Sequence, residues 1–252
     1  MNFYLPKLIG HRGIKDLAPE NTLFSIIKAK QFNLRWIEID VKISKDKIPF
    51  LLHDDNLDRT TSGKGIPTQY LYKQILNLDA GSWFDIKFKN LYTPTLKEVL
   101  QYCSQNNIGV NIELKPNIGF KKATVLAVVK LIKKLKFSCP YYISSFDWYS
   151  INLTRKLLPE SYIGILLDKN NMYNNYQYFF YKCKKNNINI CGFNKKIISK
   201  KLVKTSKKYG MLITVYSSKN IKKTEANYLW NLGIDSIFID NPRSYKKILN
   251  SN

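Results

Sequence analysis

Short apolar segments rich in β-branched residues alternate along this chain with stretches of helical length, and this alternation constrains the fold most strongly. It is typical of a parallel α/β sheet, because parallel neighbours need a crossover of about a dozen residues or more. The pattern predicts strands at Lys7–Gly10, Trp36–Val41, Pro49–His53, Gly109–Leu114, Tyr141–Ser144, Tyr162–Leu167, Ile188–Gly192, Leu212–Tyr216 and Ser236–Ile239. It predicts helices at Asn21–Phe32, Leu96–Asn106, Phe120–Lys136, Trp148–Leu158, Tyr173–Asn186, Ser199–Tyr209, Ile221–Leu232 and Pro242–Leu249.

One predicted strand lacks a crossover. Between Val41 and Pro49 only a turn around Asp46 and Lys47 fits, so we expect an antiparallel hairpin with Asp40 opposite His53. The remaining strands suit an α/β barrel of eight, and a chain of 252 residues suits one such domain over 1–252. Residues 54–94 interrupt the alternation and are expected to form a small insertion above the rim, where long insertions are usually functional.

The chain has a formal net charge of +23, which raises polyanions as partners. Only five of its 41 Lys and Arg residues are arginines, the type that binds phosphate bidentately, so we expect a solvated lysine surface and no specific nucleic-acid binding. The four cysteines form no CxxC pair, which favours reduced thiols. The first residues lack signal-peptide features and no apolar run has membrane-span length. We therefore expect a cytoplasmic protein without membrane insertion.

The chain contains only two histidines, and both end apolar segments. His11 lies in Gly10-His11-Arg12-Gly13, and His53 precedes Asp54 and Asp55. Histidine has an ordinary pKa of about 6.5 and therefore suits acid and base catalysis near neutral pH. A packed or surface imidazole is the alternative for either one alone. Barrel enzymes place their active sites at strand ends, so we predict that this pair acts as general acid and base.

Carboxylates recur with a spacing of two residues in predicted strands. Glu38 and Asp40 share one face of their strand, and Glu113 shares a face with Lys115. Three carboxylates without cysteine favour a hard divalent cation, Mg²⁺ or Ca²⁺, over zinc. A buried ion pair is the alternative for either pair alone. With Arg12 and the histidines at other strand ends, the set indicates metal-assisted cleavage of a phosphate ester.

Several ordered motifs together resemble the glycerophosphodiester phosphodiesterase family of the cytoplasmic bacterial type. They cover nearly the whole chain and are His11–Gly13, Ala18–Thr22, Ile37–Val41, Leu52–Asp54, Arg59–Thr61, Asp79–Phe84, Pro94–Leu96, Asn111–Pro116 and Ser144–Phe146. The resemblance implies a TIM (β/α)8 barrel with a small insertion after the hairpin that ends at His53. It also implies hydrolysis of glycerophosphodiesters to sn-glycerol 3-phosphate and an alcohol.

The resemblance assigns roles by position. It implies metal ligands at Glu38, Asp40 and Glu113, an acid/base pair at His11 and His53, and phosphate-contacting cations at Arg12 and Lys115. Glu20 matches a family acidic residue, although a role at a helix N-terminus is equally plausible. Phe146 and Trp83 are candidates for the wall of a glycerol pocket, with core packing as the alternative. Ser217-Ser218-Lys219 departs from the family's Thr-x-Asn phrase, which leaves the pocket at that strand end open.

Two other functions compete with this interpretation. One is a phospholipase-type phosphodiesterase acting on another head group, and the other is a lysine-rich protein that binds polyanions without catalysis. The intact metal-ligand and histidine positions favour the glycerophosphodiester reaction. The sequence leaves open the preferred alcohol, the choice between Mg²⁺ and Ca²⁺, which histidine is the acid, and the oligomeric state.

Overall fold

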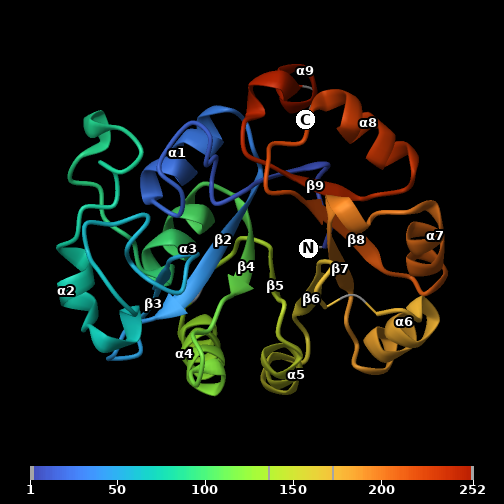
Figure 1. The fold of residues 1–252 in the computed structure, drawn as a ribbon, viewed down its shortest axis with the longest axis horizontal. Helices are drawn as coiled ribbons and strands as arrows, with labels where there is room; N and C mark the ends of the chain where they lie inside the picture. Colours follow the sequence, from blue (N-terminus) through green and yellow to red (C-terminus); the bar gives the residue numbers. More distant parts are fainter. Residues whose placement is uncertain (1–2, 136, 172, 251–252) are drawn as a thin grey trace.

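The computed structural model describes residues 3–135, 137–171 and 173–250. Within them, eight parallel strands close into a barrel, and β3 pairs antiparallel with the far end of β2 (Figure 1). The strands are β1 Leu8–Gly10, β2 Trp36–Ile43, β3 Pro49–Leu51, β4 Gly109–Leu114, β5 Tyr141–Ser145, β6 Tyr162–Leu167, β7 Ile190–Asn194, β8 Leu212–Tyr216 and β9 Ser236–Ile239. The predicted TIM barrel is confirmed.

Helices surround the barrel, as Figure 1 shows. They are α1 Leu23–Gln31, α2 Tyr72–Leu76, α3 Leu96–Gln105, α4 Lys121–Lys134, α5 Trp148–Leu157, α6 Tyr176–Lys185, α7 Lys200–Lys208, α8 Lys223–Asn231 and α9 Lys246–Leu249. Side-chain caps start many of them; Thr95 and Glu98, for example, form a capping box on α3. No helix in the described ranges is long and apolar enough to cross a bilayer.

Two apolar layers hold the barrel together. Inside it, one buried residue from each of five strands forms a cluster: Ile9, Trp36, Tyr142, Ile190 and Phe238. Outside it, a larger cluster fills the space between strands and helices. Because alternate residues of a strand face opposite sides, β2 places Trp36, Glu38 and Asp40 on the inner side and Ile37 and Ile39 on the outer side. The carboxylates therefore lie above an apolar plug.

The predicted hairpin register is wrong by one residue. Val41 pairs with Leu51, and the Leu52 N–H donates to the Asp40 carbonyl, so Leu52 rather than His53 lies opposite Asp40. The turn has an odd number of residues because Lys47 adopts the left-handed conformation with φ of +61°. Three-residue hairpin loops characteristically end in such a residue. Beyond β3 the chain leaves the strand conformation, and His53 still reaches the barrel mouth.

Other boundaries also differ from the predictions. Strand β7 lies two residues later than predicted, and the helix predicted at Pro242–Leu249 is a 3₁₀ turn, η4 Pro242–Tyr245, followed by α9. Lys136, the predicted end of α4, lies outside the described residues, as do residues 1–2 and 251–252. The segment 54–94 contains α2 and two 3₁₀ turns, η1 Pro67–Gln69 and η2 Ile86–Phe88. Its own small core, including Leu57 and Ile75, packs against Phe50 of β3.

Gly109 of β4 is paired with Trp36 of β2, and a Cβ at Gly109 would overlap the buried Trp36 ring. We predict that Gly109→Ala lowers the free energy of unfolding by about 1–3 kcal/mol, the usual cost of overpacking. Gly164→Ala on β6 is the matched control, since its added Cβ would meet neighbours no closer than 3.4 Å. Urea denaturation of both variants measures the difference, and equal stability of the two would contradict this account of the inner layer.

Candidate active site

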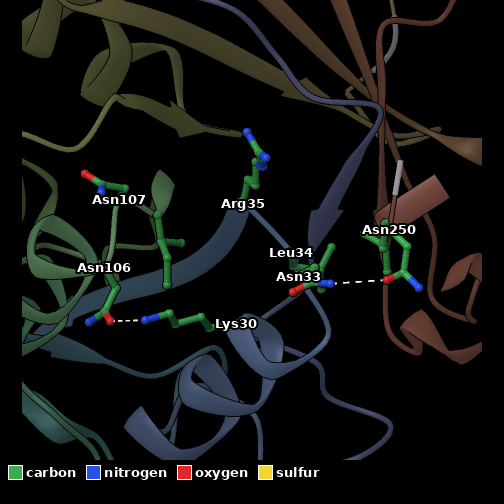
Figure 2. A pocket seen from close by; sticks show the side chains of 9 residues that line it. Lys30, Asn33, Leu34, Arg35, Asn106, Asn107 and Asn250 are labelled. Carbon is green, nitrogen blue, oxygen red and sulfur yellow. Dashed lines mark hydrogen bonds between the residues drawn. The ribbon is translucent and has the colours of Figure 1, made fainter. Parts of the chain in front are cut away.

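A pocket of about 410 Å³ opens at the carboxyl ends of the parallel strands. Its lining includes most residues predicted for the site: His11, Arg12, His53, Glu113, Lys115 and Phe146. Another cavity, of about 570 Å³, lies at the opposite face, where Arg35 precedes β2 and Asn107 precedes β4 (Figure 2). In barrel enzymes the carboxyl-terminal face carries the chemistry and the opposite face serves stability. The first pocket is therefore the candidate active site.

The predicted acidic residues meet at the base of this pocket. Parallel pairing of β2 and β4 sets Asp40 beside Glu113, and Glu38 lies two residues before Asp40 on the same face. One carboxylate oxygen from each lies within 4.8 Å of the others, and all three residues are buried. Oxygen donors at such spacing fit a hard divalent cation.

The electrostatics of the three carboxylates support that fit. Burial and then the neighbouring negative charges raise the pKa of Glu38, and burial is also the main cause of the raised pKa of Glu113. The Glu38 Oε1 atom is buried and has no hydrogen-bond partner among the residues that the structure describes. A buried oxygen normally has a partner, so an unpartnered oxygen on a member of this carboxylate trio is suited to act as a ligand of a cation.

Asp40 differs from the other two because its pKa is lowered, whereas the pKa values of Glu38 and Glu113 are raised. The Asn21 side chain donates to Asp40 Oδ2 over 2.8 Å and accepts from the Asp40 N–H over 3.1 Å. Arg12 Nε and Lys115 Nζ lie 3.3 and 3.8 Å from its carboxylate oxygens. Burial would raise the pKa of Asp40, but these cations outweigh it and hold the pKa well below its ordinary value. The lowered pKa keeps Asp40 ionised at neutral pH.

The two histidines have matching surroundings. His11 Nδ1 lies 2.7 Å from Asp240, which follows β9, and His53 Nδ1 lies 2.6 Å from Asp54. An ionised carboxylate accepts the Nδ1–H, which leaves the lone pair on Nε2. Burial lowers the pKa of both rings, that of His53 to about 4. Both imidazoles are therefore neutral near pH 7 in this structure.

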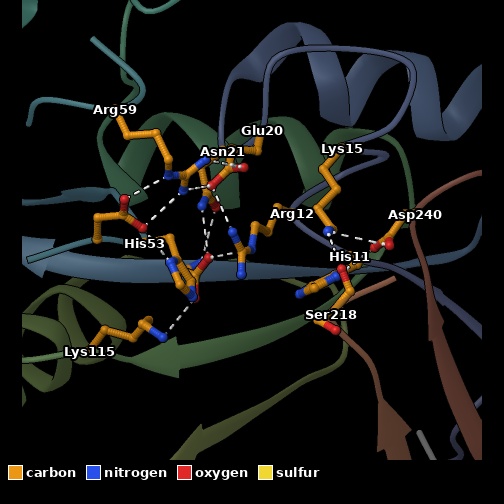
Figure 3. Close-up of polar contacts among 12 residues, drawn as sticks. His11, Arg12, Lys15, Glu20, Asn21, His53, Arg59, Lys115, Ser218 and Asp240 are labelled. Atoms are coloured by element: carbon orange, nitrogen blue, oxygen red, sulfur yellow. Dashed lines mark hydrogen bonds and ion pairs between the residues drawn. The ribbon is translucent and has the colours of Figure 1, made fainter. Parts of the chain in front are cut away.

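A chain of ion pairs connects His53 to the other side of the site (Figure 3). Arg59 donates to Asp54 from Nε and Nη2 and to Glu20 from Nη1 and Nη2, over 2.6–3.0 Å. Glu20 also accepts from Arg12 Nη1 over 2.8 Å. Helix α1 is capped by Thr22, so Glu20 serves this network and not the cap. One buried carboxylate thus bridges two arginines.

Sequence reasoning did not single out four of these residues: Asn21, Asp54, Arg59 and Asp240. Asp54 follows His53 directly, and Asn21 and Arg59 lie in motifs already quoted, so their positions carried a signal. Asp240 is 229 residues from His11 in the sequence. Its position after a predicted strand was the one sequence signal that could have pointed to it.

Only one of the two aromatic candidates, Phe146, lines the pocket. Phe146 lines the pocket, packs edge-on against Tyr216 and has Lys115 Nζ 5.8 Å from its ring centre. Trp83 is not among the lining residues; its ring lies 5.6 Å from the Arg59 guanidinium, which does line the pocket. Ser217 and Ser218, where the sequence departs from the family pattern, also line it.

Fold and site together define a TIM-barrel protein of the enzyme type, with a pocket at the carboxyl ends of its strands and three carboxylates that could hold a cation. The profile of the Glycerophosphoryl diester phosphodiesterase family matches residues 11–244. A glycerophosphodiester phosphodiesterase of Bacillus altitudinis is 30% identical over 97% of this chain and 98% of that protein. One from Caldanaerobacter subterraneus is 36% identical over 63% of this chain and 65% of its own length.

A solved structure agrees with the sequence comparisons. It is that of an Oleispira antarctica phosphodiesterase in complex with the product sn-glycerol-3-phosphate, and it superimposes with a TM-score of 0.89 at 30% identity, covering 98% of each chain. The chain described here belongs to the glycerophosphoryl diester phosphodiesterase family.

Proposed function

We propose that this protein, acting as one catalytic domain, hydrolyses glycerophosphodiesters to sn-glycerol 3-phosphate and an alcohol with the help of a divalent cation. The observation that carries the proposal is the trio Glu38, Asp40 and Glu113, set within 4.8 Å of one another in a pocket lined by two histidines. The product bound to the Oleispira antarctica relative supports the choice of substrate.

Glu38, Asp40 and Glu113 would hold Mg²⁺ or Ca²⁺, both of which prefer carboxylate oxygens. The bound ion would offset charge on the phosphoryl oxygens as the ester bond breaks. Arg12 and Lys115 border the same space and are mostly buried, with 13% and 20% of their side chains exposed. Cations in such partly dry surroundings attract a phosphodiester more strongly than surface lysines do.

The histidines move the protons. Each Nδ1 is held by a carboxylate, so each ring keeps a fixed orientation and uses Nε2 toward the substrate. One neutral imidazole takes the proton of the attacking hydroxyl, which belongs either to water or to the substrate's own glycerol. The other protonates the leaving alkoxide and must first acquire a proton. Attack by the tethered glycerol hydroxyl would benefit from its high effective concentration and give a cyclic phosphate that water opens.

The reaction is tested by release of sn-glycerol 3-phosphate from glycerophosphocholine with and without EDTA. We expect turnover that EDTA abolishes and that Mg²⁺ or Ca²⁺ restores. Glu38→Gln, Asp40→Asn and Glu113→Gln should each lower turnover and raise the cation concentration needed for half activity. Full activity of these variants in EDTA would overturn the metal assignment, and no release under any condition would overturn the reaction.

The acid/base assignment predicts a loss of at least about a hundredfold in kcat for His11→Ala and for His53→Ala. The pH profile of kcat/KM should be bell-shaped, and the variant that lacks the base should lose the limb on the acidic side. Asp54→Asn and Asp240→Asn should lower kcat with KM little changed, since they alter ring orientation and leave the imidazole in place. Wild-type turnover in either alanine variant would contradict the catalytic role of that histidine and indicate a structural role.

A further inference from the structure

A groove of about 790 Å³ lies outside the active site, between the β2–β3 hairpin turn and helix α4. We call it the α4 groove. Ile48 of the turn and Ala123 and Leu126 of α4 line it; Ile48 and Leu126 are 37% and 44% exposed. At the end of the groove, next to its lining residue Gly119, Ile118 is 95% exposed. Apolar side chains clustered in this way are a recognised sign of an interaction site.

Four exposed lysines border the same groove: Lys47, Lys122, Lys130 and Lys134. None of them forms an ion pair with a described residue. The one carboxylate in the lining, Asp46, accepts hydrogen bonds from the Ser44 hydroxyl and the Tyr72 N–H. The groove therefore combines apolar side chains with a net positive charge, since four lysines and one carboxylate line it.

The α4 groove begins at the catalytic face. The segment that carries Ile118 starts at Lys115, which lines the active-site pocket, and it ends where α4 begins at Lys121. On the other side of the groove, the hairpin continues β2 beyond Asp40. Figure 1 shows α4 beside the end of β2. A surface that covered the groove and Ile118 would therefore lie next to the mouth of the pocket.

We propose that the α4 groove and Ile118 form a peripheral docking surface for an anionic lipid bilayer. The charge of the groove requires an anionic partner and disfavours a second copy of this chain, which would bring another +23. A peptide lying in the groove would leave the protruding Ile118 in water. A bilayer interface covers both, because apolar side chains enter the acyl boundary while flanking lysines meet anionic head groups.

Docking of this kind would hold the pocket mouth close to a lipid surface. Deacylation of membrane phospholipids is the class of reaction that yields diesters with a free glycerol moiety, so the proposed substrates would arise at that surface. This consequence rests on the proposed function, but the docking itself does not, since it is measured without substrate.

The test is co-sedimentation of the intact chain with vesicles of phosphatidylcholine alone or mixed with phosphatidylglycerol. We expect binding only to the mixed vesicles. The charge variant Lys122→Glu/Lys130→Glu should weaken vesicle binding at least about tenfold. The apolar variant Ile118→Ser/Leu126→Ser should also weaken vesicle binding, even at low salt. Charge attraction is strongest at low salt, so a loss there shows that the apolar side chains contribute to binding.

Matched controls separate this groove from the general excess of lysine. Lys204→Glu/Lys208→Glu on α7 makes the same charge change at exposed sites, and Tyr178→Ser/Tyr228→Ser removes apolar side chains that are 57% and 58% exposed on α6 and α8. Both controls should bind nearly as wild type, and circular dichroism should show every variant folded.

Three outcomes would overturn the proposal. One is the absence of vesicle binding, and another is an equal loss in the control variants, which would assign binding to diffuse charge. The third is binding of an acidic amphipathic peptide at the groove without vesicle binding, which would make the partner a protein. The two proposals can fail separately. If the hydrolysis assay fails but vesicle binding still depends on the groove, the proposed function is contradicted and the docking surface is supported.

Discussion

The architecture of the site depends on the burial of three carboxylates on two adjacent parallel strands, β2 and β4. Desolvating one such charge costs several kcal/mol unless positive charge or hydrogen bonds offset it. Arg12 and Asn21, which both contact Asp40, adopt the left-handed backbone conformation, with φ of +52° and +55°. Asn tolerates this conformation, whereas an arginine adopts it at a cost in free energy. In the loop after β1, the conformation of Arg12 accompanies a hydrogen bond from its N–H to Glu38 Oε2 over 2.9 Å.

The buried carboxylates are also connected to a wider network of ion pairs around the site. Arg12 lies against Asp40 and Glu20, Glu20 also binds Arg59, and Arg59 holds Asp54, which orients His53. A displacement of any residue in this network would change the positions of both the carboxylates and His53. Trp83 lies against Arg59, and both residues belong to the segment 54–94, so this segment contributes to the network. That arrangement gives the insertion a physical role in positioning His53.

Much of this could be predicted because it follows from local periodicity. The period of two put Glu38 and Asp40 on one face, the missing crossover revealed the hairpin, and strand ends located both histidines. The register of the hairpin could not be predicted, since it depends on the left-handed conformation of Lys47. Asp240 was missed because it is joined to His11 only by closure of the barrel between β1 and β9. The α4 groove likewise arises from tertiary packing of the hairpin against α4.

Glu38, Asp40 and Glu113 are proposed to bind one divalent cation together. Isothermal titration calorimetry of the purified chain with MgCl₂ and CaCl₂, beside Glu38→Gln/Glu113→Gln, measures this without any substrate. We expect binding of one ion per chain for at least one of the two cations, and at least about a hundredfold weaker binding by the double variant. The same affinity in both proteins, or no binding by the wild type, would contradict it.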